Sequence, residues 1–566
     1  MPVSPLQKNQ ILDLTVEGYG TDAQGVCRAD GFTVFVPYAL PGERVRVRIV
    51  KVERRYAFGR VEAVLSPSPQ RTEPPCPIYR RCGGCVAQHM RYEETLAFKR
   101  RQVRDCLARI GDISIDVPPV IGMENPWHYR NKGAYPVGGS AGSPRVGFFA
   151  PRSHDLVDLP EAGCAIQREE ANEAVRAVKR WMRMASVSSY DENTHKGLVR
   201  HIMVRAARTG ETMVVLAING ESVPQADALV AQLRSAIPTL TGVLLSVNRE
   251  RTNVILGGRI VTLWGSDSMI DTLLGLRFRV SPLSFFQVNP EQTERLYSLA
   301  LDFAQLTGSE TVVDAYCGAG TISLLLARAA KRVVGIEIVP QAIADANENA
   351  ARNGIENATF LVDAAEAALP RLVEEGLRPD VVVIDPPRKG CDEAVLRAIA
   401  ASAPRRVVYV SCNPATLARD AALLVSLGYE PARIACVDMF CWTGAIETVM
   451  SLVQQKPDDI VKVDIDADEL AVTKADSKAT YGEIQARVKE QTGLNVTPLY
   501  IAQVKRKHGI IERECYNKSK SENSKMLICP SDKDRPEDQR RPFPHRGSQQ
   551  RKAAQRVPRH RLQLPD

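Results

Sequence analysis

The chain has 566 residues, of which 44% are hydrophobic and 25% charged, as in ordinary globular proteins. Its length favours three or four domains. No N-terminal apolar run suits a signal peptide and none approaches the ~20 residues of a membrane span, so we expect a cytoplasmic protein without a membrane partner. The net charge of +8 is concentrated in residues 518–566, which hold 13 Lys or Arg against 6 Asp or Glu. A surface for a polyanion elsewhere must therefore be a local patch.

Residues 1–67 alternate apolar and polar side chains in short runs separated by Gly, Pro and Asp. This pattern predicts four or five strands that close into a small barrel of the oligonucleotide-binding kind. Three arginines alternate with valines and should share one strand face, with two aromatic residues following: Arg44, Arg46, Arg48, Tyr56 and Phe58. Basic and aromatic side chains together suit single-stranded RNA. A charged strand edge that prevents aggregation is the alternative.

Residues 68–280 predict a central α+β domain that opens with a cysteine motif. Cys76, Cys82 and Cys85 form a C-x5-C-x2-C run rich in Pro and Gly, and a helix is expected directly afterwards, over residues 92–110. Without a secretory signal, such cysteines favour metal binding or catalysis over disulfides. Further candidates for RNA contact, against the alternative of ordinary surface or core residues, are Arg130, Lys132, Phe148, Phe149, Arg200, His201 and Arg205.

Strands and helices alternate through residues 281–455, which predicts a parallel, doubly wound α/β sheet of the Rossmann-like type. The loop at 316–321, YCGAGT, follows a strand, and its glycines allow a ligand to approach the backbone closely. Glu337 ends the next strand, where a carboxylate can accept hydrogen bonds from both hydroxyls of a ribose. Because the loop lacks the G-x-G-x-x-G of pyrophosphate sites, the two features together indicate a site for S-adenosylmethionine.

Two further strand ends carry candidate chemical groups. Asp385 begins DPPRKG after an apolar strand, and Cys412 lies in YVSCNPATLARD after another. A thiolate is a strong nucleophile near neutral pH when its neighbours lower its pKa. Its attack on carbon 6 of uracil would activate carbon 5 for methylation, after which a base must remove the proton from carbon 5. Glu447, a carboxylate in an apolar strand, is the candidate base because burial raises its pKa.

Taken together, the chain resembles the RNA (uracil-5-)-methyltransferase family, in its bacterial 23S ribosomal RNA branch with an N-terminal TRAM domain. The matching stretches are SFFQVNPEQTERLY (284–297), DAYCGAGTISL (314–324), GIE (335–337), DPPRKG (385–390), YVSCNPATLARD (409–420) and the IETV around Glu447. The resemblance covers roughly residues 8–455.

The resemblance implies a role for each candidate residue. The methyl donor would be contacted by Gln287, Tyr316, Glu337 and Asp385, with Cys412 as nucleophile and Glu447 as proton acceptor. A [4Fe-4S] cluster would be held by Cys76, Cys82, Cys85 and the distant Cys164. Four thiolates suit zinc equally well, and spacing does not choose between the two. The implied partner is structured RNA, most naturally 23S rRNA, and no obligatory protein partner is implied.

The sequence departs from the family pattern at Ala445, where a His usually precedes the general base by two residues. This departure leaves open a catalytically weakened RNA-binding or ribosome-assembly protein. The other alternative is the same chemistry on transfer RNA, which a related branch of the family modifies. Methylthiotransferases are disfavoured, because their cysteines follow a C-x3-C-x2-C spacing. Cytosine methyltransferases typically use two cysteines.

The C-terminal region lies beyond the resemblance. Residues 456–516 predict a small extension, and residues 517–566 predict a disordered basic tail, because they lack apolar periodicity.

Overall fold

The computed structural model describes residues 6–455, 460–464, 481–492 and 561–565. Contacts divide the chain into two units, Met1–Gln454 and Gln455–Asp566. Among the described residues, no helix combines the length and apolar character that crossing a bilayer requires.

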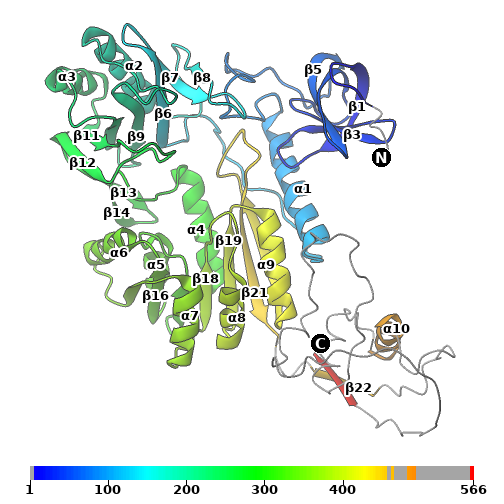
Figure 1. Cartoon of the computed structure of the whole chain (residues 1–566). Coiled ribbons are helices and arrows are strands. Elements are labelled where there is room, and N and C mark those ends of the chain that lie inside the picture. Colours follow the sequence, from blue (N-terminus) through cyan, green and yellow to red (C-terminus); the bar gives the residue numbers. More distant parts are fainter. Residues whose placement is uncertain (1–5, 456–459, 465–480, 493–560, 566) are drawn as a thin grey trace, which may run out of the picture. The chain divides into compact units, whose positions relative to one another are not determined.

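The predicted N-terminal barrel is present. Its strands are β1 (Ile11–Tyr19), β2 (Gly25–Ala29), β3 (Phe32–Val36), β4 (Arg44–Val52) and β5 (Tyr56–Ser66), closed in the order β1-β2-β3-β5-β4 (Figure 1). Val45, Val47 and Ile49 of β4 are fully buried in the barrel core, whereas the arginines between them face outward. The period-two alternation therefore identifies the two faces of β4 correctly.

The central region contains a second sheet. Its elements are β6 (Lys132–Ser140), β7 (Ser143–Phe149), β8 (Leu156–Asp158), α2 (Glu169–Met184), β9 (Val199–Ala206), β10 (Thr212–Ile218), α3 (Ala226–Ala236), β11 (Leu240–Val247) and β12 (Arg259–Gly265). The strands lie in the order β12-β11-β10-β9-β6-β7-β8, and α2 and α3 share a core with them around the buried Trp181. A hairpin of β13 (Met269–Leu273) and β14 (Leu276–Val280) leads to the next domain.

The third region is the predicted doubly wound fold. Its elements are α4 (Pro290–Ala304), β15 (Thr311–Asp314), α5 (Thr321–Ala327), β16 (Arg332–Glu337), α6 (Pro340–Arg352), β17 (Ala358–Val362), α7 (Ala365–Glu374), β18 (Val381–Ile384), α8 (Glu393–Ser402), β19 (Arg406–Ser411), α9 (Pro414–Ser426), β20 (Tyr429–Val437) and β21 (Glu447–Gln454). The strand order is β17-β16-β15-β18-β19-β21-β20, and β21 runs antiparallel to both of its neighbours. The order reverses between β15 and β18, which is where open α/β sheets bind ligands.

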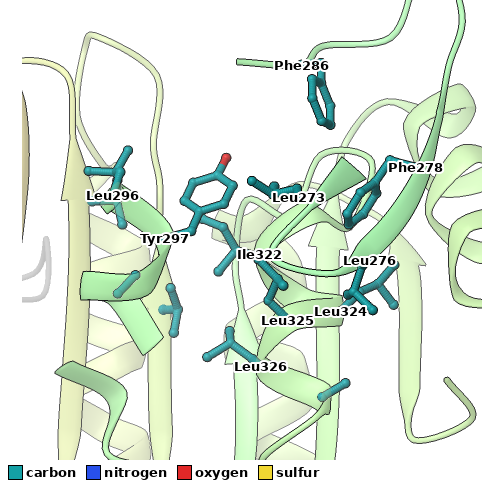
Figure 2. Close-up of a cluster of buried hydrophobic side chains, with 14 of the residues drawn as sticks. Leu273, Leu276, Phe278, Phe286, Leu296, Tyr297, Ile322, Leu324, Leu325 and Leu326 are labelled. Carbon is teal, nitrogen blue, oxygen red and sulfur yellow. The ribbon is translucent and has the colours of Figure 1, made fainter. Parts of the chain in front are cut away.

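Successive residues of the strands fill two cores, one on each face of this sheet. Val312, Val383 and Val408 pack with α4 and α5, whereas Val313, Val382 and Val407 pack with α8 and α9. Figure 2 shows part of the first core, in which Tyr297 of α4 lies beside Ile322 of α5 and its hydroxyl points away from the packed leucines. Strands buried on both faces explain the continuous apolar runs in the sequence.

Helix α1 (Tyr92–Ile110) forms where it is predicted and ends at Gly111. Its Val103 and Leu107 pack into the same core as Leu417 and Leu424 of α9. A Cβ at Gly111 would lie 2.8 Å from the carbonyl oxygen of Ala418, so glycine permits the close approach of the two helices. Thus α1 packs against the C-terminal sheet domain, although it precedes the central domain in sequence.

In the second unit, β22 (Ile460–Asp464) pairs antiparallel with β23 (Arg561–Pro565), and α10 spans Tyr481–Thr492. Strand β23 lies within the predicted disordered tail and differs from that prediction. Its alternating residues, RLQLP, match the alternating IVKVD of β22. The remainder of the predicted tail and most of the predicted extension lie outside the described residues.

Candidate active site

The candidate donor-binding residues lie at the carboxyl edge of the C-terminal sheet. The loop that follows β15 leads into α5 through Gly318 and Gly320, both with positive φ (54° and 79°). The backbone N–H of Gly318 donates to Glu337 Oε2 at 3.2 Å, so the carboxylate at the end of β16 lies directly beside the glycine loop. The predicted pairing of a Gly-rich turn with an acid at the next strand end is thus present in space.

Asp385, Cys412 and Glu447 are brought together by strand register. Ile384 pairs with Tyr409, and Ser411 pairs with Thr448, so Asp385 and Cys412 each follow the last residue of a paired strand. Glu447 is the first residue of the neighbouring β21 and pairs with Val437 of β20. Asn413 caps α9 by accepting from the backbone N–H of Ala415 (3.1 Å). Three groups from widely separated stretches therefore meet at one edge of the sheet.

Burial dominates the electrostatics of these groups. Burial and the charge of Asp314 raise the pKa of Asp385 to about 7. Burial, followed by the charge of Asp385, raises the pKa of Glu447 well above its ordinary value, and Arg388 opposes this shift. Glu447 is 3% exposed. The carboxyls can therefore hold or accept a proton near neutral pH, as the sequence predicts for Glu447.

The Cys412 thiol does not have the lowered pKa that would make it a thiolate near neutral pH. Burial, followed by the charges of Glu447 and Asp385, raises the pKa of this thiol to about 11, and Arg388 acts in the opposite direction. The N-terminus of α9 and one cation do not offset the burial of the thiol. In this protein the thiol therefore stays protonated at neutral pH until the charge around it changes.

The segment between β14 and α4 presents side chains next to this edge. Gln287 is half-buried within it, and Phe285 is 71% exposed. From beneath, the buried guanidinium of Arg205 donates to the carbonyls of Pro282 (3.3 Å) and Ser284. These bonds tie the segment to β9, while Phe285 is exposed to solvent and Phe286 is buried. The sequence SFFQ does not show which of the two phenylalanines is exposed.

Tyr316 follows β15 in the glycine loop. Its side chain is half-buried, and burial raises its pKa, with Cys391 as the next largest influence. Tyr316 therefore lies between the loop and the start of α8, close to the Asp385 segment.

The predicted RNA contacts of Arg200 and Arg205 are wrong. Both arginines are buried, at 5% and 2% exposure. Arg200 donates to the carbonyls of Asn248 (2.9 Å) and Glu250 (2.7 Å), and its guanidinium lies over the ring of Tyr190. Strand alternation does not reveal these partners, because the loop at 248–252 covers Arg200 and the segment at 282–284 covers Arg205.

The basic and the aromatic residues of the barrel differ in how they are paired. Arg46 pairs with Asp13 (2.8 Å) and Arg48 with Glu62 (2.5 Å), so their charges are partly compensated. In contrast, the rings of Phe35, Tyr56 and Phe58 contact one another, and Arg152 of the β7–β8 loop lies 5.1 Å from the Phe58 ring centroid. This aromatic face suits an unpaired nucleic-acid strand better than β4 does.

The four predicted cluster cysteines line one cavity of about 240 Å³. They share it with apolar side chains that include Ile78, Phe148 and Leu159. Among the described residues, no group of three or more His, Cys, Asp or Glu is arranged to hold a metal ion. Cys164, distant in the sequence, lines the same cavity as the three clustered cysteines, and their joint ligation of a metal or cluster stays a prediction.

Comparison with known proteins now defines the class. Residues 5–61 match the TRAM domain, and residues 274–455 match the family described as tRNA (Uracil-5-)-methyltransferase. An uncharacterized RNA methyltransferase of Halalkalibacterium halodurans is 49% identical over 79% of this chain and 98% of its own length. One of Clostridium tetani is 47% identical over 79% and 97%. The chain therefore belongs to the RNA (uracil-5-)-methyltransferase family.

A solved structure supports the fold. The tRNA (uracil-54, C5)-methyltransferase of Pyrococcus abyssi, in complex with S-adenosyl-L-homocysteine, superimposes with a TM-score of 0.63. At 24% identity, it covers 78% of this chain and 100% of its own. The Rossmann-like methyltransferase fold and the N-terminal barrel predicted from the sequence are confirmed.

Proposed function

We propose that this protein methylates carbon 5 of a specific uridine in structured RNA, with S-adenosylmethionine as methyl donor. The observation that carries the proposal is the convergence of Cys412, Glu447 and Asp385 at one edge of the sheet, beside the glycine loop and Glu337. A half-buried nucleophile, a buried base and an adenosine-binding edge are the three parts that this reaction needs.

In the proposed donor site, the carboxylate of Glu337 accepts from the ribose hydroxyls of the donor. Asp385, Gln287 and Tyr316 contact the rest of the donor from the surrounding loops. When bound, S-adenosylmethionine supplies an electrophilic methyl group and a positive charge. A positive charge near Cys412 would favour its thiolate, which the two carboxylates otherwise disfavour.

The proposed reaction proceeds through a covalent adduct. Cys412 loses its proton, and its sulfur bonds to carbon 6 of uracil while the C5–C6 electron pair moves towards oxygen 4 as an enolate. Carbon 5 then forms a bond to the methyl group as the donor's S–CH₃ bond breaks. Glu447 accepts the proton from carbon 5, the S–C6 bond breaks, and the C5–C6 double bond re-forms. The raised pKa of Glu447 makes it an effective base near neutral pH.

For the substrate we propose 23S rRNA, with transfer RNA as the second candidate. The combination of barrel and four-cysteine cavity favours the first, by the resemblance of the sequence to that branch. The Pyrococcus abyssi protein is a tRNA methyltransferase, which supports transfer RNA as the second candidate substrate. In either case the target base must leave its stack to reach Cys412, and the exposed Phe285 could stack against the RNA there.

The four cysteines that line this cavity could supply the thiolates of a [4Fe-4S] cluster or of a zinc ion, and we propose the cluster because of the resemblance of the sequence to the ribosomal RNA branch. Four thiols in a largely apolar cavity are the donor set of a cubane cluster. Cys76, Cys82, Cys85 and Cys164 would hold it, with a structural role that joins the barrel's linker to the central domain.

The test uses purified protein, unmodified 23S rRNA or tRNA, and methyl-labelled donor. We expect labelled 5-methyluridine with the wild type and none with Cys412→Ala. With Glu447→Gln we expect a methylated protein–RNA complex that survives denaturing electrophoresis, because the proton on carbon 5 stays in place. Label in tRNA alone would change the substrate. Absence of label and of complex, with RNA binding retained, would support the binding-protein alternative.

A further inference from the structure

The loop between β20 and β21, residues 438–446, ends directly at Glu447. At its start, Asp438 is fully buried and pairs with the equally buried Lys99 of α1 at 2.5 Å. The hydroxyl of Tyr92, also from α1, donates to the same carboxylate at 2.8 Å. Helix α1 therefore fixes the first residue of the loop by a fully desolvated ion pair, which holds only with good geometry.

A second anchor lies at Trp442, five residues before Glu447. Its carbonyl oxygen accepts from the backbone N–H groups of Val86 (2.9 Å) and Ala87 (3.1 Å). These donors immediately follow Cys85 of the cysteine cavity, so the wall of that cavity and the loop share two hydrogen bonds.

The Trp442 side chain strengthens this anchor. Its indole N–H donates to the carbonyl of Pro126 (3.0 Å), and its ring stacks on Trp127 at 4.5 Å between centroids and 23° between planes. Trp442 has φ of +66°, a conformation that bulky side chains rarely adopt. Such a backbone persists where its surroundings impose it, and such residues cluster at functional sites.

The loop has no polar side chain of its own beside the base. Ala445 and Ile446 directly precede Glu447, and neither can orient a carboxylate by hydrogen bonding. Glu447 itself opens β21 and pairs with Val437 of β20, so its position is set by strand pairing and by the anchored loop that leads into it.

We propose that Trp442 is a positioning residue for Glu447. Through Trp442, the wall of the cysteine cavity would influence the removal of the proton from carbon 5. The inference rests on the proposed role of Glu447. It assigns to this loop a function in the last step of the reaction, and none in the attack of Cys412 or in methyl transfer.

The experiment compares Trp442→Ala, Trp442→Phe and Glu447→Gln in full-length protein with labelled donor and RNA. The control is Trp264→Ala, which removes a half-buried tryptophan of β12 whose ring lies 4.8 Å from the guanidinium of Arg234. Trp442 itself is buried. The two readouts are the methylated protein–RNA complex on denaturing gels and the rate of product release. A purely structural role would lower both together.

With Trp442→Ala we expect the complex to accumulate and product release to fall about 10- to 100-fold, the order that a misplaced catalytic group costs. Trp442→Phe, which keeps a ring over Trp127, should restore most of the release rate, and Trp264→Ala should resemble the wild type. If Trp442→Ala does not fold, Trp127→Ala removes the same stack without changing the loop. It should accumulate the same complex.

The outcomes separate the two proposals. Absence of labelled 5-methyluridine with the wild type would overturn the proposed function, and failure of Glu447→Gln to accumulate complex would overturn the role of Glu447 as base. Accumulation with Glu447→Gln, but not with Trp442→Ala or Trp127→Ala, would overturn the positioning role alone, as would equal loss of complex and product.

Discussion

The groups around Cys412 have opposite effects on the pKa of its thiol, and their balance determines when the reactive thiolate forms. Burial and two carboxylates disfavour its thiolate, whereas Arg388 favours it. A nucleophile held protonated in the free enzyme is protected from oxidation and stray alkylation, since the thiolate is the reactive form.

This balance predicts an unusual pH dependence of alkylation. Reaction of Cys412 with iodoacetamide should rise with pH towards about 11, the raised pKa of the thiol, and should be slow at pH 7. Glu447→Gln should shift this curve to lower pH, because a neutral amide does not repel the thiolate. Mass spectrometry of the peptide containing Cys412 measures the rate separately from the other cysteines. An unshifted curve would show that Glu447 does not act on the thiol.

Phe285 is exposed and should contribute to RNA binding rather than to stability. Stacking of a base on an aromatic ring is worth about 1–3 kcal/mol, so Phe285→Ala should weaken RNA binding while leaving the unfolding temperature unchanged. Leu283→Ala, at a 50% exposed position in the same segment, is the control and should bind RNA normally. Filter binding and thermal unfolding of both variants check this. A lowered unfolding temperature for Phe285→Ala would indicate a packing role instead.

At the scale of elements, the glycine loop is constrained by both backbone and packing. Gly320 has φ of 79°, and a Cβ there would lie 3.1 Å from Ala346 Cβ and 3.2 Å from the Phe360 ring. Gly354 has φ of 64°, with no heavy atom within 4 Å of such a Cβ. A Cβ at Gly354 would meet backbone strain alone, whereas a Cβ at Gly320 would meet both backbone strain and steric crowding.

Alanine at the two positions should therefore differ in effect. Gly354→Ala should cost about 1–2 kcal/mol of unfolding free energy through its backbone alone. Gly320→Ala should cost more and should also weaken donor binding, because α5 and the loop must shift. Urea unfolding and calorimetry with S-adenosylhomocysteine measure the two effects. Equal losses of stability at both positions would contradict the argument.

Elements with strong local signals could be predicted from the sequence, and those defined by tertiary contacts could not. The barrel strands, α1 with its terminal glycine, and the strand ends at Asp385 and Cys412 follow from periodicity and turn residues. The burial of Arg200 and Arg205 was missed, because the second layer that covers them comes from residues about 50 to 80 positions away. The anchors of Trp442 have the same origin, since their partners lie more than 300 positions away.

At the scale of the whole molecule, the extent of similarity to the relatives predicts which part of the chain the proposed reaction needs. The Halalkalibacterium halodurans relative matches this chain over 451 residues, almost its entire length, and the family match ends at residue 455. A chain ending at Gln455 should therefore methylate RNA at the rate of the full chain at low salt. If the basic residues 518–566 add affinity for phosphates, the two chains would differ most in the salt dependence of RNA binding. Loss of methylation on truncation would assign the extension a part in the reaction.

The packing of α1 on α9 limits the order in which the chain can fold during its synthesis. Helix α1 leaves the ribosome roughly 300 residues before its partner α9 does. At ~5–20 residues per second, this interval lasts roughly 15–60 s. During this interval, Val103 and Leu107 cannot pack against α9, and Lys99 cannot form its ion pair with Asp438. The barrel can close early in synthesis, but the catalytic edge is completed only when the last strands emerge.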